Sequence, residues 1–171
     1  IVLEQIRRLI DFLPQSNNSK GKIKSTDDNS GRIIESLDTL IPADKSKAYN
    51  MKDLIIKIAD DEEFMEVQEN YATNIVIGFI RIEGHSIGVV ANQPLSLAGC
   101  LDINSSTKGA RFVRFCDCFN IPILTLVDVP GFLPGTQQEF NGIIKHGAKL
   151  LFAYAEATTP KVTLIPRKAY G

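Results

Sequence analysis

Two proline–glycine pairs in the second half of the chain could shape a ligand site from backbone atoms. The stretch that holds them reads Asp128-Val129-Pro130-Gly131-Phe132-Leu133-Pro134-Gly135-Thr136. Neither a helix nor a strand can continue through turn signals spaced so closely. Glycines in such a loop let backbone N–H groups approach a ligand without interference from a Cβ atom. We therefore predict a site that works through backbone amides and not through reactive side chains.

Candidate side-chain chemistry elsewhere in the chain is weak. The two histidines are His85 and His146, and no carboxylate is spaced to orient either of them as a base. We expect both to be packed or solvated, with His85 exposed beside a turn. Asp128 and Gly131 match a D-x-x-G motif of some nucleotide triphosphatases, but residues 1–127 lack the G-x-x-x-x-G-K-S/T phosphate loop that this function requires. A G-x-S-x-G nucleophile motif is also absent.

Charged and sulfur-bearing residues give no indication of a metal site. The acidic run at residues 60–63 is typical of a helix N-terminus in solvent. Cys116 and Cys118 lie two apart on a predicted helix, so they point to different faces, and we expect both to be small buried hydrophobic residues. Arg167 and Lys168 directly follow the last predicted strand, where a bound phosphate group and a solvated strand end explain them about equally well.

The elements that must position the loop follow an α/β pattern. Residues 123–127 form an apolar, β-branched run, typical of a strand buried on both faces. A helix over residues 108–119, with an N-cap in the Ser105-Ser106-Thr107 cluster, is predicted before this strand, and residues 161–165 predict the last strand. The strand–helix–strand order implies parallel strands joined by a right-handed crossover. Ligands of such sheets bind beyond the carboxyl ends of the strands.

The helix predicted directly after the loop spans residues 139–157. Gly142 and Gly147 lie inside it, where glycine lowers helix propensity but permits close packing. We expect one stripe of this helix to face inward, formed by Ile143, Gly147, Leu150, Leu151 and Tyr154. Upstream, residues 74–82 and 85–91 predict a β-hairpin. Two short helices are predicted before it, one near residues 51–58 and one that begins at the acidic run.

The composition is that of a globular protein, with 44% hydrophobic and 23% charged residues among 171. A net charge of -1 gives no strong attraction to nucleic acid or to an anionic membrane. No apolar run approaches the roughly 20 residues of a membrane span, and no signal peptide is visible. Because the chain begins at Ile1 without Met and stops after a predicted strand, we expect a segment of a longer protein. Residues 1–13 predict a helix, and residues 14–36 have the polar composition of a linker or a disordered segment.

Several motifs in a fixed order point to one family. They are Asn92-Gln93-Pro94, Ala98-Gly99-Cys100-Leu101-Asp102-Ile103, Lys108-Gly109-Ala110-Arg111-Phe112-Val113-Arg114-Phe115, the loop of residues 128–135, His146-Gly147-Ala148-Lys149-Leu150-Leu151 and Arg167-Lys168-Ala169-Tyr170-Gly171. This order resembles the carboxyltransferase β subunits of biotin-dependent acyl-CoA carboxylases, of the type that acts on propionyl-CoA. The resemblance covers roughly residues 37–171. It implies that residues 1–13 are the last helix of a preceding carboxyltransferase N-terminal domain, residues 14–36 a linker, and residues 37–171 a truncated C-terminal domain.

The resemblance also implies a fold, a reaction and partners. The fold is a crotonase-like ββα spiral, built twice per subunit, whose halves meet across a dimer interface inside a hexamer. The enzyme is a ligase within an ATP-dependent holoenzyme, located in the bacterial cytoplasm or the mitochondrial matrix. Carboxybiotin on a biotin carboxylase or biotin carrier partner releases CO2, biotin N1 takes the α-proton of propionyl-CoA, and the enolate attacks CO2 to give methylmalonyl-CoA. Two oxyanion holes of backbone amides hold the ureido and thioester oxygens.

Carried onto this chain, the resemblance implies two sets of site residues and no metal. The expected catalytic positions are Gly131, Phe132, Gly135 and Gly171. The expected positions against biotin and coenzyme A are Pro130, Leu133, Thr136 and Tyr170.

Two departures and two alternatives accompany this resemblance. The second oxyanion hole of the family follows Arg-Lys-Ala-Tyr-Gly at a Gly-Ala pair, which lies past Gly171, so the isolated segment is expected to be inactive. Pro166 replaces a residue that is usually not proline and removes an N–H donor at the end of the last strand. One alternative is an acyl-CoA decarboxylase or transcarboxylase subunit of the same fold. The other is a non-catalytic module that only completes the pocket of a neighbour.

Overall fold

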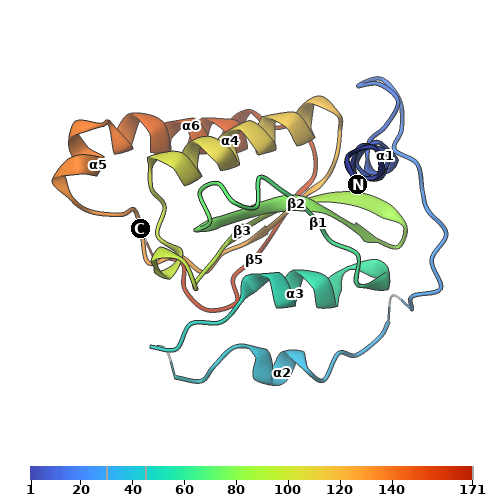
Figure 1. Ribbon diagram of the computed structural model, residues 1–171, viewed down its shortest axis with the longest axis horizontal. Helices are drawn as coiled ribbons and strands as arrows, with labels where there is room; N and C mark the ends of the chain where they lie inside the picture. The colour runs from blue at the N-terminus through green and yellow to red at the C-terminus, as the bar shows by residue number, and fades with distance from the viewer. Residues whose placement is uncertain (30, 45, 171) are drawn as a thin grey trace.

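A five-stranded mixed sheet forms the centre of the molecule and carries helices on both faces (Figure 1). The computed structural model describes residues 1–29, 31–44 and 46–170. The strands are β1 (Met65–Val67), β2 (Ile75–Ile82), β3 (His85–Asn92), β4 (Ile123–Leu126) and β5 (Lys161–Leu164). They stand in the sheet in the order in which they occur in the chain. The α/β class predicted from the sequence is confirmed.

The pairing changes direction at β3. β1, β2 and β3 pair antiparallel, and Ile82 faces His85 across the tight turn of the predicted hairpin. β3, β4 and β5 pair in parallel, with Ile123 of β4 between Gly88 and Lys161. The carboxyl ends of these three strands therefore meet at one edge of the sheet, as the strand–helix–strand order predicted.

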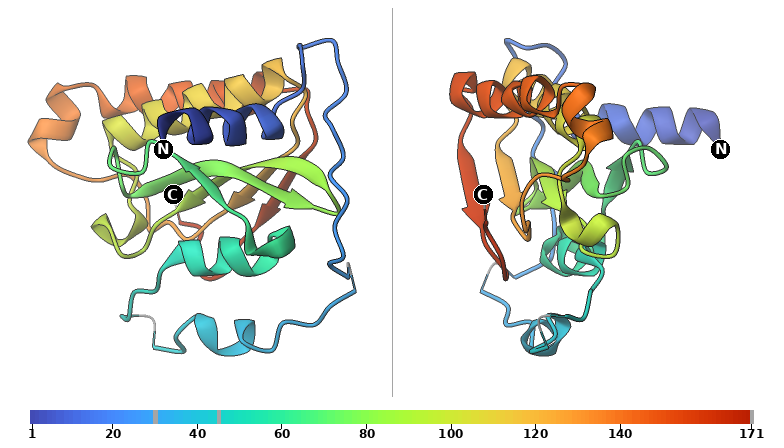
Figure 2. Two further views of the ribbon diagram at one scale, coloured as in Figure 1. Left: turned by 45° about the vertical axis from the view of Figure 1, so that its right-hand side comes forward. Right: turned by 90° about the vertical axis from the view of Figure 1, so that its left-hand side faces the viewer.

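The helices form one layer on each face of the sheet. They are α1 (Val2–Phe12), α2 (Leu37–Leu40), α3 (Met51–Ile58), α4 (Ile103–Cys118), α5 (Thr136–Phe140) and α6 (Ile143–Glu156), with short 3-10 turns η1 (Asp60–Glu62) and η2 (Leu97–Gly99). α4 and α6 lie side by side on one face, and α3 covers the other, with α2 on the far side of α3 from the sheet (Figure 1). α1 projects from the body of the molecule on the side of α4 (Figure 2), and its Phe12 stacks on Phe79 with ring centroids 5.9 Å apart. None of the helices in the described ranges is long and apolar enough to span a membrane.

Alternate residues of the strands feed two separate cores. Ile75, Ile77 and Phe79 of β2 pack with α4 and α6. Val76 and Ile80 point to the opposite face and pack with α3. This period of two follows from the pleat of a strand. A strand that is covered on both faces needs apolar residues at successive positions, which explains the unbroken apolar runs in the sequence.

The N-cap of α4 differs from the prediction. Asp102 is the cap, and its side chain accepts a hydrogen bond from the Ser105 amide at 2.8 Å. The Ser105 hydroxyl accepts one in return from the Asp102 amide at 2.8 Å, which completes a capping box. The helix therefore begins at Ile103, five residues before the predicted start. The sequence predicted the serine cluster as the cap, but the cluster supplies only the third residue of the first turn, Ser105.

The acidic run is not the start of a second helix in solvent. It forms the short turn η1, and β1 follows directly. Asp60 is buried and accepts hydrogen bonds from the Glu83 and Gly84 amides at 3.2 and 2.7 Å. Glu63 pairs with Arg81 at 3.0 Å. The run therefore supports the hairpin turn, a role that depends on residues about twenty positions away and is not visible locally.

The helix predicted over residues 139–157 is divided into α5 and α6. Gly142 has a φ of +83° and stands at the N-cap of α6, so it interrupts the helix instead of lying within it. Ile143, Gly147 and Ala153 are the buried residues of α6, with Leu150 and Tyr154 packed against the core. Leu151 is 71% exposed, so its place in the predicted inward stripe is wrong.

A buried lysine ties α4 to the turn that precedes the hairpin. Lys108 is 2% exposed, and its ammonium donates to the carbonyl groups of Gln68, Tyr71, Ala72 and Ile75 at 3.1, 2.6, 3.4 and 2.9 Å. Burial lowers the pKa of this lysine. A charged group is tolerated at such a position because its hydrogen-bonding capacity is filled.

The segment of residues 14–36 has neither helix nor strand in its described part and follows one end of the sheet (Figure 2). The Lys24 amide donates to the Gly84 carbonyl at 3.1 Å, and Arg32 donates to the Lys57 and Ala59 carbonyls at 3.1 and 2.9 Å. The division of the chain into a preceding helix, a linker and a C-terminal domain stays a prediction.

Candidate functional site

The loop of residues 128–135 leaves β4 at the edge where the parallel strands end. On one side it pairs with Leu101, whose amide donates to the Gly131 carbonyl at 3.1 Å and whose carbonyl accepts from the Leu133 amide at 2.8 Å. These bonds form a short parallel bridge between Leu101 and Phe132. The loop is therefore attached to the segment that enters α4.

A second parallel bridge attaches the other side of the loop to the segment after β5. The Val129 amide donates to the Lys168 carbonyl, and the Tyr170 amide donates to the Val129 carbonyl, both at 3.0 Å. Segments that follow β3, β4 and β5 thus run side by side past the end of the sheet. The position predicted for a ligand, beyond the carboxyl ends of the strands, is where these three segments lie.

Both loop glycines adopt backbone conformations that other residues rarely reach. Gly131 has a φ of +143° and Gly135 a φ of +129°. A Cβ atom on either would meet no heavy atom within 4 Å, so conformation and not crowding requires glycine here. Among the described residues, none accepts a hydrogen bond from the amides of Gly131, Phe132 or Gly135. Backbone amides without an acceptor have the chemical character of oxyanion donors.

The other predicted positions fall on the same edge. Pro130 is half-buried and Thr136 is exposed at the start of α5, while Tyr170 is exposed beside Val129. The Leu133 amide is already used by Leu101, which leaves only the half-buried side chain of Leu133 for a ligand. Gly171 lies outside the described residues.

Asp128, directly before the loop, is the most constrained residue of this edge. Its side chain is 1% exposed, and Oδ2 accepts a hydrogen bond from Arg167 Nε at 3.0 Å. Arg167 is therefore engaged in a buried ion pair and fits neither of the two interpretations left open for it, a phosphate ligand or a solvated strand end. The strand-end position predicted a solvated or phosphate-binding arginine, and 39 residues separate it from the aspartate that it contacts.

Tyr49 borders the same pair. Its ring centroid lies 5.0 Å from Arg167 Cζ, and its hydroxyl is buried. Burial raises the pKa of Tyr49, and the neighbouring negative charge of Asp128 raises that pKa further. Sequence reasoning did not single out Tyr49, and no local signal marks it, because its partners come from two distant strand ends.

The remaining candidates for side-chain chemistry lie apart from the loop or lack partners. His85 is exposed at the hairpin turn, as predicted. His146 is half-buried on α6, with Nδ1 3.1 Å from Lys149 Nζ. Cys116 is buried, which raises its pKa to about 12, but Cys118 is exposed, so that part of the expectation is wrong. No group of three potential metal ligands occurs in the described part of the chain.

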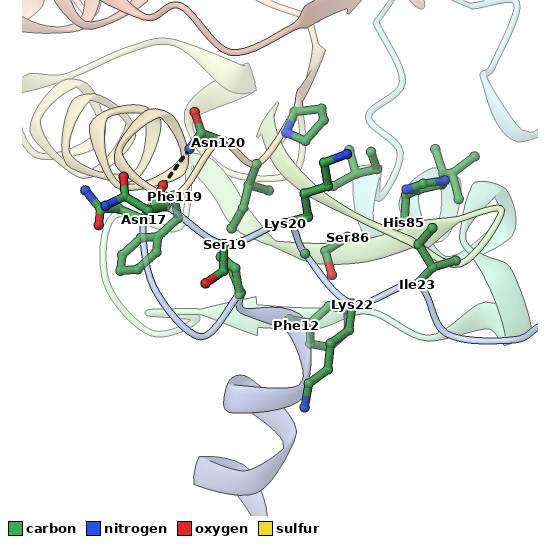
Figure 3. A pocket seen from close by; sticks show the side chains of 17 residues that line it. Phe12, Asn17, Ser19, Lys20, Lys22, Ile23, His85, Ser86, Phe119 and Asn120 are labelled. Carbon is green, nitrogen blue, oxygen red and sulfur yellow. Dashed lines mark hydrogen bonds between the residues drawn. The ribbon is translucent and has the colours of Figure 1, made fainter.

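A cavity of about 730 Å³ lies at the opposite end of the sheet (Figure 3). The segment of residues 17–23 covers it, and Phe12, His85, Ser86 and Asn120 line it. His85 and Ser86 stand at the start of β3 and Asn120 shortly before β4, so the cavity lies where the parallel strands begin. The cavity is therefore separate from the loop of residues 128–135 and does not contribute to the candidate site.

Comparison with known proteins identifies the family. The family model described as "Carboxyl transferase domain" matches residues 1–171. The chain belongs to this family. It is 66% identical over 169 residues to the propionyl-CoA carboxylase beta chain of Cereibacter sphaeroides and 60% identical over 166 residues to the mitochondrial propionyl-CoA carboxylase beta chain of Rattus norvegicus. It covers 33% and 31% of these relatives, so the chain spans about a third of their length.

Other members of the family have different names and similar folds. The methylmalonyl-CoA decarboxylase subunit alpha of Veillonella parvula is 56% identical over 169 residues, and 33% of its length is covered. A transcarboxylase 12S structure, described as a hexamer with methylmalonyl-coenzyme A bound, superposes with a TM-score of 0.92 at 50% identity, over 95% of this chain and 31% of that one. The carboxyltransferase fold of crotonase-like type, expected from the resemblance, is confirmed.

Proposed function

We propose that this chain is part of the carboxyltransferase subunit of a biotin-dependent acyl-CoA carboxylase. In that role it moves a carboxyl group from carboxybiotin to the α carbon of propionyl-CoA and yields methylmalonyl-CoA. The similarity to propionyl-CoA carboxylase beta chains supports this substrate. One observation supports the mechanism above all others: beyond the carboxyl end of β4 stands a glycine loop whose amides at Gly131, Phe132 and Gly135 have no acceptor in the part of the chain that the structure describes.

The loop suits the electronic demand of carboxyl transfer. When bound, carboxybiotin on a partner protein would supply CO2 and, as free biotin, a nitrogen that can accept the α-proton. The new C–C bond forms between the α carbon of the thioester enolate and CO2. The charge on the enolate oxygen needs fixed N–H donors in a site that excludes water. We assign this task to the amides of Gly131, Phe132 and Gly135, and we propose Gly171, which follows Tyr170 in the sequence, as a further catalytic position.

Side chains of the same edge would shape the binding surface. Pro130 and Leu133 offer apolar contacts beside the amides, while Thr136 and Tyr170 offer hydroxyl groups on the exposed rim. In this proposal the chain's own residues bind and orient the acyl-CoA and exclude water from the site. No base is asked of His146, whose nearest polar partner is a lysine.

Assembly with other chains is part of this proposal. Large apolar side chains stand exposed on α5, α6 and β5, namely Phe140, Ile144, Leu151, Phe152, Val162 and Leu164. Exposed patches of this kind mark surfaces that pack against another domain or subunit. The hexameric assembly named for transcarboxylase 12S supports a homo-oligomer, with a biotin carboxylase or biotin carrier subunit as a further partner. We propose a location in the bacterial cytoplasm or the mitochondrial matrix, since one relative is bacterial and another is named as mitochondrial.

A second candidate function is decarboxylation of methylmalonyl-CoA or transcarboxylation. The 56% identity to a methylmalonyl-CoA decarboxylase subunit alpha favours it. The same amides would stabilise the enolate in either direction, because the enolate is common to forward and reverse transfer. Comparison of the rates of carboxylation and decarboxylation by the full-length subunit separates these functions.

The experiment that tests the proposed mechanism is Gly135→Val in the full-length subunit. Valine cannot adopt the backbone conformation of Gly135 without strain, so the donors should move and turnover should fall more than about tenfold. Gly21→Val is the matched control, because Gly21 has open space around it and no positive φ. Wild-type turnover in the Gly135 variant would remove the loop from the mechanism. The isolated segment should transfer no carboxyl group, and if it does, the requirement for a second set of amides is wrong.

A further inference from the structure

Asp128 is contacted from the ends of the two strands that flank β4. Its amide donates to Asn92 Oδ1, at the end of β3, at 3.2 Å. Gly99, in the segment after β3, lies so close that a Cβ atom there would come within 2.4 Å of the Asp128 carbonyl oxygen. From the other side, Arg167 reaches back from the segment after β5 to Asp128 Oδ2. One residue therefore connects all three strand ends.

Arg167 extends this connection to the opposite layer of the molecule. Its Nη1 donates to the Lys47 carbonyl at 2.8 Å, while its Nε holds Asp128. The guanidinium lies against the Tyr49 ring, and the arginine side chain is 9% exposed. A planar guanidinium can hold two acceptors in fixed directions at once, which a lysine ammonium on a flexible stem cannot reproduce.

Burial makes this ion pair sensitive to the loss of either member. A carboxylate that is removed from water needs a partner, and the loss of that partner is strongly destabilising. Arg167 compensates the charge of Asp128, and the buried Tyr49 hydroxyl lies close enough to this carboxylate for the carboxylate to raise the pKa of Tyr49. Asp128 also adjoins Val129, whose amide and carbonyl form the bridge to Lys168 and Tyr170.

We propose that Asp128 and Arg167 form a positioning pair that fixes the loop after β4 against the segment after β5. The pair thereby keeps a constant distance between the backbone amides of the loop and those of the segment after β5. The inference rests on the carboxyl-transfer function proposed above. Asp128 and Arg167 would influence the reaction by holding the loop in place and would not contact the substrate. A displacement of about 1 Å in catalytic groups can lower a rate about a hundredfold, so the spacing matters even though neither side chain faces the open edge.

The test compares Arg167→Met, Arg167→Lys and Asp128→Asn in the full-length subunit with its biotin-bearing partner. We expect Arg167→Met to lower kcat by about tenfold to a hundredfold, with the KM for propionyl-CoA within about twofold of wild type. Arg167→Lys keeps the charge but cannot hold Asp128 and the Lys47 carbonyl together. Its kcat should therefore lie between those of the wild type and Arg167→Met. Arg114→Met is the matched control, because Arg114 pairs with Glu156 at 3.1 Å on the exposed surface of α4 and α6.

Hydrogen exchange supplies a readout that does not depend on activity. In Arg167→Met the amides of Val129 and Tyr170 should exchange faster, while residues 123–126 in β4 keep their protection. Unchanged exchange at Val129 and Tyr170, or a kcat close to wild type, would overturn the proposal. Loss of protection throughout β4 in all three variants would overturn it as well, since the pair would then serve stability alone.

The two proposals can fail separately. If the wild-type assembly transfers no carboxyl group, the proposed function fails, and the exchange at Val129 and Tyr170 still decides whether the pair positions the loop. If the wild type is active and Arg167→Met matches it, only the positioning pair fails.

Discussion

The ring of Phe132 lies directly over Gly147 of α6. A Cβ atom on Gly147 would stand 2.8 Å from the Phe132 ring, closer than side chains tolerate. Phe132 belongs to the glycine loop and also forms the bridge to Leu101. The absence of a side chain at Gly147 therefore sets how near the loop can come to α6.

Gly147→Ala should separate stability from activity. Phe132 is 47% exposed and can swing outward, and alanine gains about 1 kcal/mol over glycine inside a helix, so the free energy of unfolding should change by less than about 1 kcal/mol. Displacement of the Phe132 ring, which belongs to the loop, should nevertheless lower carboxyl transfer several-fold. Thermal unfolding and initial rates measure the two effects.

Phe132→Ala is the companion variant for this prediction. The double variant Gly147→Ala/Phe132→Ala should be no slower than Phe132→Ala alone, because both changes act on the same contact. Additive losses would show that Gly147 affects activity by another route.

Leu150 and Leu151 are adjacent on α6 and should respond differently to truncation. Leu150 packs against the core, and a Cβ atom on Gly109 would lie 3.2 Å from its Cδ1. Leu150→Ala should cost about 2–3 kcal/mol of unfolding free energy, the lower part of the range for buried leucines, because Leu150 is only partly buried. Leu151→Ala should change it by less than about 0.5 kcal/mol in a monomer. Denaturant titration of both variants checks the pair, and equal losses would refute the burial pattern.

Asp60→Ala should loosen the hairpin turn. The substitution leaves the buried amide of Gly84 and that of Glu83 without their acceptor, at a cost of about 1–3 kcal/mol. Asp61→Asn is the control, since Asp61 is exposed and its φ of +53° suits asparagine. Faster amide exchange at Gly84 in the Asp60 variant alone is the expected signature. Equal exchange in both variants would contradict the support assigned to Asp60.

The contribution of the α4 N-cap to the free energy of unfolding should decrease at acidic pH. Burial by itself raises the pKa of Asp102, but hydrogen bonds from Ser105 and Asn74 outweigh it and hold the pKa below its usual value of 3.8. Because the folded pKa is the lower one, the stabilisation is complete above the unfolded value and is lost as the pH falls through the folded value. Asp102→Ala should cost about 0.5–2 kcal/mol at pH 7 and less near pH 3. Unfolding titrations at both pH values measure this, and a pH-independent cost would contradict the cap's charge dependence.

Local patterns in the sequence predicted the hairpin, β4 and the position of the glycine loop. β2 and β3 are long enough to be recognised as strands from their apolar residues alone. Pro130-Gly131 likewise marks the end of β4 without any information from the rest of the fold. β1 has three residues and exists only because it pairs with β2, so no local pattern could reveal it. Helical spacing continues through Gly142, and only the left-handed backbone at that residue shows the interruption.

The sequence predicted the loop that carries the candidate site, but it did not predict the side-chain contacts that support this loop. The accessible amides of the loop could be predicted because the proline–glycine pairs that produce them are adjacent in the sequence. The contact of Asp128 with Arg167 depends on the parallel register of β4 and β5, and in the sequence the two residues look like an isolated motif match and a solvated strand end. Tertiary pairing decides such contacts, so composition and spacing cannot supply them.

Lys108 gives the turn of residues 68–75 a cation that belongs to the protein. An ion dissolved in the solvent could fill four inward-facing carbonyl groups, but its occupancy would follow its concentration. Here the positive charge is covalently attached to α4, 33 to 40 residues along the chain. The turn therefore closes only when α4 docks, and its geometry is independent of the salts around it. The turn that leads into β2 and the first turns of α4 therefore form together when the chain folds.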